Sequence, residues 1–243
     1  MESYSAETYG ERIAAVYDDL YSGYEEIAIH RLAQMAQGGR ALEFGIGTGR
    51  IALPLQAMGV EVHGIDASPA MIEKLKAKPG GDRIQVLEGD FTTVEAQGKF
   101  SLVYIVFNTI FAPLTQEQQL HCFENAARHL TPEGVFVVEA FVPDLKRFSA
   151  GQVLRVNSMD NDNLFLDASQ VDIPRQLITA QHVHLSAQGV EIFPVRLRYI
   201  WPAEMDLMAR LAGLRLRHRW GGWEQSAFGA ASQRHISLYE LDQ

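Results

Sequence analysis

The sequence predicts an α/β protein in which a seven-stranded, mostly parallel sheet carries helices on both faces and is followed, after its fifth strand, by an antiparallel insert. Strand-like and helix-like segments alternate from residue 40 to residue 141, which requires crossover connections between parallel strands. Continuous apolar runs such as LVYIVF are typical of strands that are covered on both faces of a sheet. After Pro143 four strand-like segments follow one another, and these predict the insert.

The composition fits one folded domain and argues against several classes of protein. The 243 residues are 47% hydrophobic, which is enough for a sizeable core, and a net charge of −9 argues against a nucleic-acid partner. The single cysteine, Cys122, rules out an internal disulfide and supplies no metal framework. The start of the chain is polar and acidic, and no apolar run reaches about 18 residues. We therefore expect a cytoplasmic protein without a signal peptide or a membrane span.

Local signals place the elements of the first half in order. Apolar residues at helical spacing predict a helix over 24–37, which stops at two glycines before a strand at 40–44. Pro54 is expected to kink the first turns of the next helix, over 50–59. The strands that follow are expected at 60–66, 83–90 and 100–107. A helix at 68–78 is capped by Ser68, and a helix at 116–130 opens with a Thr115–Gln118 capping box.

The second half completes the sheet after the insert. The fifth strand is expected at 134–141, and a helix at 203–213 precedes two closing strands. The insert strands are predicted at 152–159, 163–172, 176–186 and 190–201, and the closing strands at 214–220 and 234–241.

A glycine-rich turn, ALEFGIGTGR at residues 41–50, follows the first strand. Glycines permit positive φ and a close backbone approach, and the helix that follows offers free N–H groups, so this turn is a candidate ligand cradle. A dinucleotide fingerprint starting at Gly45 would need its third glycine at position 50, where the chain has Arg50. A nicotinamide dinucleotide enzyme remains an alternative that Arg50 opposes.

Acidic residues follow the next two strands. Asp66 ends the second strand, 21 residues after Gly45, where a carboxylate can accept both hydroxyls of a ribose. Asp90, within Gly89-Asp90-Phe91, ends the third strand. Because the carboxyl ends of parallel strands meet at one edge, these groups predict a nucleoside site there.

The segment from Glu43 to Gly49 matches E-x-G-x-G-x-G and resembles the first motif of the class I S-adenosylmethionine-dependent methyltransferases. The resemblance covers about residues 9–141, and it implies a Rossmann-like fold with S-adenosylmethionine as the cofactor. It also implies that Asp66 holds the ribose and Asp90 the adenine amino group, with Phe91 and Met71 against the ring. The cofactor-binding residues that it implies are Glu43, Phe44, Gly45, Gly47, Thr48, Gly49, Arg50, Asp66, Ala67, Met71, Gly89, Asp90, Phe91 and Phe107.

Tyrosines gather near the N-terminus, where Tyr17, Tyr21 and Tyr24 have the i, i+4, i+7 spacing of one helix face. This face either packs on the domain or forms a lid over the cofactor, as such segments often do in small-molecule members of the family. Asn108 follows the fourth strand and either orients an acceptor or caps its loop. The catalytic candidates are Tyr17, Tyr21 and Asn108. Nucleic-acid amino methyltransferases carry a Pro-Pro pair after this position, which the chain lacks.

Polar residues alternate along two insert strands. His182 and His184 share a strand face, are too few for a metal site, and are interpreted as surface or interface residues, with a general-base role as the alternative. Arg196 and Arg198 share another face, interpreted as solvated, with an anion-binding role as the alternative.

Together these observations predict a methyltransferase that acts on a nitrogen or oxygen of a small molecule, without a metal, nucleic acid or membrane as a partner. A protein or RNA methyltransferase, or a protein that binds the cofactor without methyl transfer, remains open. The strand-rich insert resembles that of amino-sugar and glycine N-methyltransferases, which implies a possible homodimer through the insert. The expected single domain, 1–243, comprises a helical lid at 1–38, a cofactor-binding core at 40–143 and 202–243, and the insert at 151–201.

Overall fold

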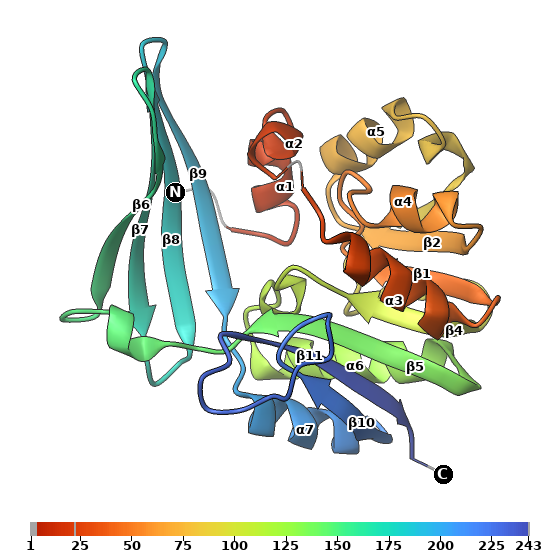
Figure 1. The fold of residues 1–243 in the computed structure, drawn as a ribbon. Coiled ribbons are helices and arrows are strands. Elements are labelled where there is room, and N and C mark those ends of the chain that lie inside the picture. Colours follow the sequence, from red (N-terminus) through yellow and green to blue (C-terminus); the bar gives the residue numbers. More distant parts are fainter. Residues whose placement is uncertain (1–3, 22, 243) are drawn as a thin grey trace.

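The chain folds around a seven-stranded sheet with the strand order β10-β11-β5-β4-β1-β2-β3 (Figure 1). This computed structural model describes residues 4–21 and 23–242. The strands from β5 to β3 in this order are parallel, whereas β11 runs antiparallel to β5 and to β10. The strands of this sheet are β1 (Arg40–Phe44), β2 (Glu61–Asp66), β3 (Gln85–Glu88), β4 (Phe100–Ile105), β5 (Leu130–Phe141), β10 (Leu214–Trp220) and β11 (Arg234–Leu241). The predicted mostly parallel sheet is confirmed.

Helices cover both faces of this sheet, which explains why its strands are apolar runs. Leu42 and Phe44 of β1 are buried in one cluster with residues of α6 (Gln116–His129) and α7 (Pro202–Leu211). Ala41 points to the other face and is buried with residues of α3 (Glu26–Ala36), α4 (Ala52–Ala57) and α5 (Pro69–Ala77). The alternation along β1 therefore divides the core into two layers.

The helix boundaries follow the predicted caps. The Thr115 hydroxyl accepts from the backbone N–H of Gln118, whose side chain in turn accepts from the N–H of Thr115. The Ser68 hydroxyl accepts from the Met71 N–H at the start of α5. Pro54 lies in the first turn of α4, where a missing N–H costs no helical hydrogen bond, so this short helix tolerates it. No helix in the described ranges is long and apolar enough to cross a membrane.

The insert forms a second, four-stranded antiparallel sheet with the order β6-β7-β8-β9. Its strands are β6 (Gln152–Met159), β7 (Asn163–Asp172), β8 (Leu177–Ser186) and β9 (Gly189–Arg198). Figure 1 shows this sheet standing beside α1 (Thr8–Ile13) and α2 (Tyr17–Leu20), which lie between it and the parallel core. Three short 3-10 turns complete the described elements: η1 (Gly81–Arg83), η2 (Thr109–Phe111) and η3 (Leu145–Arg147).

Arg198 joins the insert to the core, and its predicted solvated position is wrong. Its guanidinium is buried and donates to the Gln119 side chain of α6 at 2.5 Å and to Glu204 of α7 at 2.8 Å. It also donates to the Gln176 side chain at 2.8 Å. Arg196 is exposed, as expected. The difference arises because the end of β9 runs back under the core, so its last side chains are covered by α6 and α7.

We predict that Arg198→Ala destabilises the protein by about 3–5 kcal/mol, because it leaves a half-buried carboxylate and a buried amide without their partner. The thermal unfolding midpoint should fall by roughly 10 °C. Arg175→Ala is the matched control, since Arg175 is exposed and pairs only with Asp172 within its own turn. Equal midpoints for the two variants would show that the buried pair does not stabilise the junction.

Candidate functional site

The glycine turn between β1 and α4 needs glycine for reasons that the structure makes explicit. Gly45, Gly47 and Gly49 have φ angles of 72°, 54° and 80°, in the left-handed region that side chains disfavour. A Cβ on Gly45 would lie 2.5 Å from the Thr109 side chain, and one on Gly49 would lie 2.3 Å from Leu75. A Cβ on Gly47 would meet open space. The first and last glycines thus permit close packing, while the middle one presents bare backbone to a ligand.

Asp66 ties this turn to the end of β2. Its carboxylate accepts from the Gly47 N–H at 2.7 Å and from the Ser68 N–H at 2.9 Å. Burial raises the pKa of Asp66 above its ordinary value, and hydrogen bonds from the Ser68, Gly47 and Ala67 backbone oppose that rise. A carboxylate held in this way keeps both oxygens at the mouth of the glycine turn.

Glu43, one position before the end of β1, is buried with only 3% of its surface exposed. The Tyr104 hydroxyl from β4 donates to its carboxylate at 2.9 Å. Burial raises the pKa of Glu43 to about 8, although that hydrogen bond lowers it. Phe44, the next residue, is fully buried on the opposite face of the sheet. With this raised pKa, Glu43 keeps its proton at neutral pH, and it lies at the base of the glycine turn.

Helices α1 and α2 are fastened to this edge of the sheet. Glu11 of α1 accepts from the Ser68 hydroxyl at 2.7 Å and from the Ala70 N–H at 3.0 Å, at the start of α5. The Thr48 hydroxyl donates to Asp18 of α2 at 2.6 Å, and Lys78 pairs with the same carboxylate at 2.8 Å. The N-terminal segment is therefore held over the glycine turn by polar contacts on two sides.

Of the N-terminal tyrosines Tyr17 lines the glycine-turn cavity, but the three do not form one helix face. Tyr17 and Tyr21 have ring centroids 5.0 Å apart, and Tyr21 meets the Phe107 ring edge-on at 5.4 Å. The predicted helix through Tyr24 is wrong, because α2 ends at Leu20 and Tyr24 is 44% exposed. The backbone leaves the helical conformation at Tyr21, which removes Tyr24 from that face.

Arg50 closes the cavity of the glycine turn. Its guanidinium lies 3.9 Å from the Phe107 ring centroid and donates to the Gly23 carbonyl at 2.9 Å. It also hydrogen-bonds with the Tyr17 hydroxyl. Burial raises the pKa of Tyr17 to about 12, against the lowering effect of Arg50. The cavity measures about 30 Å³ and is lined by the glycine turn, Tyr17, Glu43, Arg50, Ile51, Val106, Phe107 and Thr109.

The other predicted cofactor residues also gather at this edge. The Gly89 N–H donates to the Asp66 carbonyl at 2.8 Å, so the ends of β2 and β3 adjoin, and Asp90 follows directly. The Asp90 carboxylate accepts from the Thr92 N–H at 2.8 Å. Phe91 is buried and stacks on Phe44 at 5.7 Å. Met71 is buried beside α1, in a cluster with Ile13 and Ala14.

Asn108 caps its loop in this structure. It has a φ of 67°, and its side-chain oxygen accepts from the Phe141 N–H at 2.8 Å. Its amide nitrogen is the group that could still donate to a ligand. Glu139 of β5 accepts from the Phe107 N–H and from the Trp223 indole, so it positions this loop. Whether Asn108 takes part in catalysis stays a prediction.

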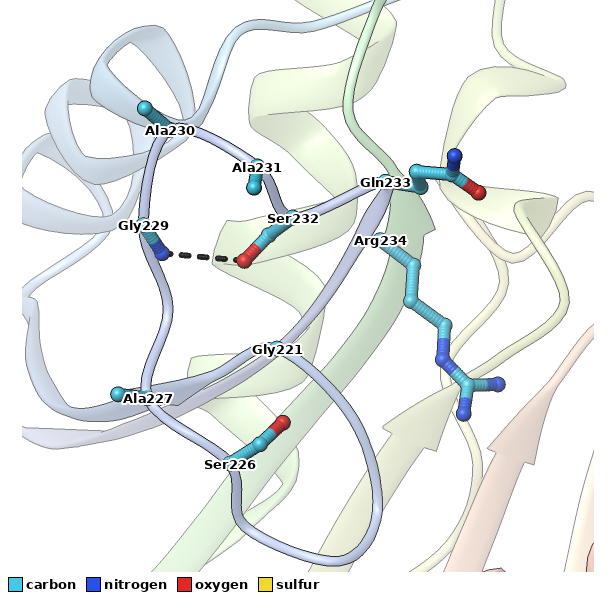
Figure 2. Close-up of a pocket in the computed structure, with 9 residues that line it drawn as sticks. All are labelled: Gly221, Ser226, Ala227, Gly229, Ala230, Ala231, Ser232, Gln233 and Arg234. Carbon is cyan, nitrogen blue, oxygen red and sulfur yellow. Dashed lines mark hydrogen bonds between the residues drawn. The ribbon is translucent and has the colours of Figure 1, made fainter.

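A second hollow, of about 730 Å³, lies in the loop between β10 and β11 (Figure 2). Its lining is mostly small, and it shares no residue with the lining of the glycine-turn cavity. Arg234 at its edge forms a two-pronged ion pair with Glu25 and also approaches Glu139. This arrangement fastens the loop to the start of α3. The small side chains offer no convergent set of charged groups to a ligand.

His182 and His184 lie at partly exposed positions of the insert, within the predicted surface or interface setting. Both are half-buried, and His182 meets the Tyr9 ring of α1 edge-on, with centroids 6.4 Å apart. His182 also donates from Nδ1 to Asp167, a residue that the sequence reasoning missed. The pairing of β7 with β8, read as a hairpin, places Asp167 opposite His182 and could have revealed it. Among the described residues no cluster of three metal-ligating side chains occurs.

Comparisons with known proteins agree with this geometry. A family model described as "Methyltransferase domain" matches residues 41–134. The CcbJ methyltransferase from Streptomyces caelestis is 37% identical, with a TM-score of 0.93 over 99% of this chain and 100% of that one. The cypemycin N-terminal methyltransferase of a Streptomyces species is 26% identical over 84% of this chain and 83% of its own length. The sugar N-methyltransferase KedS8 from Streptoalloteichus, at 18% identity, shares the fold, with a TM-score of 0.67 over 99% of each chain. The chain belongs to the class I S-adenosylmethionine-dependent methyltransferases.

Proposed function

We propose that this methyltransferase acts on a nitrogen or oxygen atom of a small molecule. The observation that carries the proposal is the position of the insert and the N-terminal helices over the strand ends that hold Glu43 and Asp66. A site covered in this way admits a small acceptor more readily than a folded protein or a duplex. The names of the KedS8 sugar N-methyltransferase and the cypemycin N-terminal methyltransferase support a nitrogen acceptor of this kind, and the net charge of −9 argues against RNA.

The residues at this edge fit S-adenosylmethionine. Gly47 offers bare backbone with open space above it, where the methionine part of the cofactor can approach. Both oxygens of Asp66 already accept hydrogen bonds at the turn, so they are placed to accept from ribose hydroxyls. Asp90 and Met71 adjoin the end of β3 and the start of α5, where we place the adenine.

When bound, S-adenosylmethionine supplies an activated methyl group on a sulfonium whose carbon–sulfur bond breaks with its electron pair left on neutral sulfur. The chain must hold the acceptor in line with that bond and exclude water, which is worth about 7–11 kcal/mol when positioning is good. Tyr17 and Tyr21 are our candidates for the lid that does this, because the Tyr17 ring lines the glycine-turn cavity and the Tyr21 ring packs on Tyr17 and Phe107. The amide nitrogen of Asn108 is a further candidate donor to the acceptor.

We also infer that the protein forms a homodimer through the outer surface of the insert. Strands at the two edges of this sheet carry exposed apolar side chains, which is unusual for a free surface. These side chains are Leu154, Val156 and Met159 on β6 and Val190 and Ile192 on β9.

We predict that S-adenosylmethionine and S-adenosylhomocysteine each raise the thermal unfolding midpoint, and that NAD does not. At 100 times its dissociation constant a ligand adds about 2.7 kcal/mol, which corresponds to roughly 5–10 °C for a chain of this size. Asp66→Ala should abolish the shift, because the carboxylate for the ribose is lost. The measurement is a thermal-shift titration of the wild type and the variant.

Asp82→Ala is the control, since Asp82 is exposed on η1 and should leave the shift intact. Asp66→Asn, which keeps the size of the side chain, separates loss of the charge from collapse of the turn. A shift with NAD alone, or with none of the three ligands, would contradict the proposed cofactor.

We predict that the stability of Glu43→Gln increases relative to that of the wild type as the pH rises from 5 to 8.5. Because the pKa of Glu43 is raised from 4.5 to about 8, the folded state keeps a proton that the unfolded state releases above pH 4.5. The stability linked to that proton is complete below about pH 4.5 and is lost as pH passes 8. The relative change should be on the order of 3 kcal/mol. Urea denaturation at several pH values measures it.

Glu73→Gln is the control for this experiment, because Glu73 is exposed on α5 and its replacement removes only a surface charge. The stability difference between Glu73→Gln and the wild type should stay nearly constant over the same range. A constant difference for Glu43→Gln as well would show that Glu43 is ionised in the folded protein at pH 5.

A further inference from the structure

We propose that Asp167 and His182 form a proton-accepting pair in the acceptor site, and that the acceptor is a small molecule that arrives with a protonated amine. This inference rests on the proposed methyl transfer, and it narrows the methylated atom of the acceptor to nitrogen. It assigns the inner face of the insert, which packs on the N-terminal helices, to recognition of the acceptor. The pair belongs to the insert sheet rather than to the parallel core, so its role is separate from cofactor binding.

The pairing of the strands builds the dyad. Asp167 of β7 lies directly opposite His182 of β8, and the Nδ1–H of the imidazole donates to the carboxylate. Asn157 of β6 also hydrogen-bonds to Asp167. Burial raises the pKa of Asp167, but the hydrogen bonds from His182 and Asn157 outweigh it and hold that pKa below its ordinary value. An ionised Asp167 accepts the hydrogen bond from Nδ1 and so orients the imidazole, which leaves Nε2 as the ring nitrogen that can exchange a proton with an acceptor.

A series of aromatic rings connects the imidazole of His182 with the glycine turn. Tyr9 meets His182 edge-on at 6.4 Å and hydrogen-bonds to the Tyr21 hydroxyl. Tyr21 in turn lies 5.0 Å from Tyr17, whose ring lines the glycine-turn cavity. Phe193, opposite His182 on β9, is buried in the same cluster as these tyrosines. The dyad therefore lies on the insert side of the tyrosine cluster, where Asp167 also acts on Tyr21.

The charged groups around the dyad favour a cation. Asp167 faces His182 from β7, and the next pair along the same face is His184 with Glu191, at 3.0 Å. Arg155 on β6 also acts on Asp167 and is exposed. The phenols of Tyr9 and Tyr21, whose pKa values burial raises, remain neutral beside them. On the insert, the carboxylates of Asp167 and Glu191 thus lie near one exposed guanidinium.

The proton transfer balances without any further reagent. An N–H bond of the ammonium breaks, its electron pair stays on the nitrogen, and the proton bonds to Nε2 of His182. The negative charge of Asp167 stabilises the imidazolium that results. The freed lone pair forms the new nitrogen–carbon bond as the carbon–sulfur bond breaks, and the imidazolium returns its proton to solvent after the product leaves. An alcohol carries no positive charge for Asp167 to attract, and its proton is far harder for imidazole to remove.

The test compares amines with matched compounds that lack a basic nitrogen. Purified full-length protein is incubated with S-adenosylmethionine and each of three pairs, and methylated products are detected by mass spectrometry. The pairs are D-glucosamine with D-glucose, Ala-Ala with N-acetyl-Ala-Ala, and benzylamine with benzyl alcohol. We expect methylation of at least one amine and of none of the matched compounds.

The variants then test the dyad on the amine that is methylated. His182→Gln should lower kcat/KM by about 100-fold or more, the usual contribution of a general base. Near neutral pH the wild-type rate should change little, whereas the His182→Gln rate should rise about tenfold per pH unit with the free-amine fraction. Added imidazole should restore part of the activity of His182→Ala. Asp167→Asn should also lower kcat/KM. His30→Gln, exposed on α3, is the control.

The outcomes separate this inference from the proposed function. Thermal shifts with S-adenosylhomocysteine must persist in every variant, and their loss in the wild type would count against the cofactor itself. Intact cofactor binding with methylation of no amine, or with equal methylation of the hydroxyl partners, would overturn the amine assignment. Equal kinetics and pH profiles for His182→Gln and His30→Gln, with no rescue by imidazole, would overturn the role of the dyad and leave the amine class standing.

Discussion

The hydrogen bond from the Gly47 N–H to the Asp66 carboxylate is the contact on which the arrangement of the site depends. It joins the turn after β1 to the end of β2, and it depends on the positive φ of Gly47, a conformation that side chains disfavour. The flanking glycines allow the same turn to press against Thr109 and Leu75. One short distance therefore fixes the glycine turn relative to three neighbouring segments, and every predicted cofactor residue is placed with respect to it.

The same turn also anchors the segment that covers it. Asp18 receives the Thr48 hydroxyl and the Lys78 ammonium, while Arg50 reaches across to the Gly23 carbonyl. A cavity of about 30 Å³ holds little more than one water molecule, so a nucleoside enters only if Tyr17, Arg50 and Phe107 move apart. These side chains are held by ring contacts and by the hydrogen bond from Arg50 to the Gly23 carbonyl rather than by the sheet core. Such contacts are individually weak, as the proposed lid requires.

The sequence was most informative where local chemistry decides the structure. The caps of α5 and α6, the glycine turn and the apolar strands were all predicted, because hydrogen bonds between near neighbours and two-sided burial determine them. One prediction that failed concerns which side of an element becomes covered. Arg198 was expected in solvent, but α6 and α7 bury it. Its partner Gln119 lies 79 residues away in the chain, where no local pattern reports it.

The division between core and insert explains why recognition of the cofactor does not identify the acceptor. The parallel core supplies Glu43, Asp66 and the glycine turn, which suit one nucleoside and would serve many reactions equally. The insert contributes a separate polar face, and the buried Arg198 pair fastens the end of its last strand to two core helices. Because α1 packs on both β9 and the start of α5, one short helix joins the insert to the cofactor edge. Specificity for the acceptor can therefore change with the insert while the cofactor site stays the same.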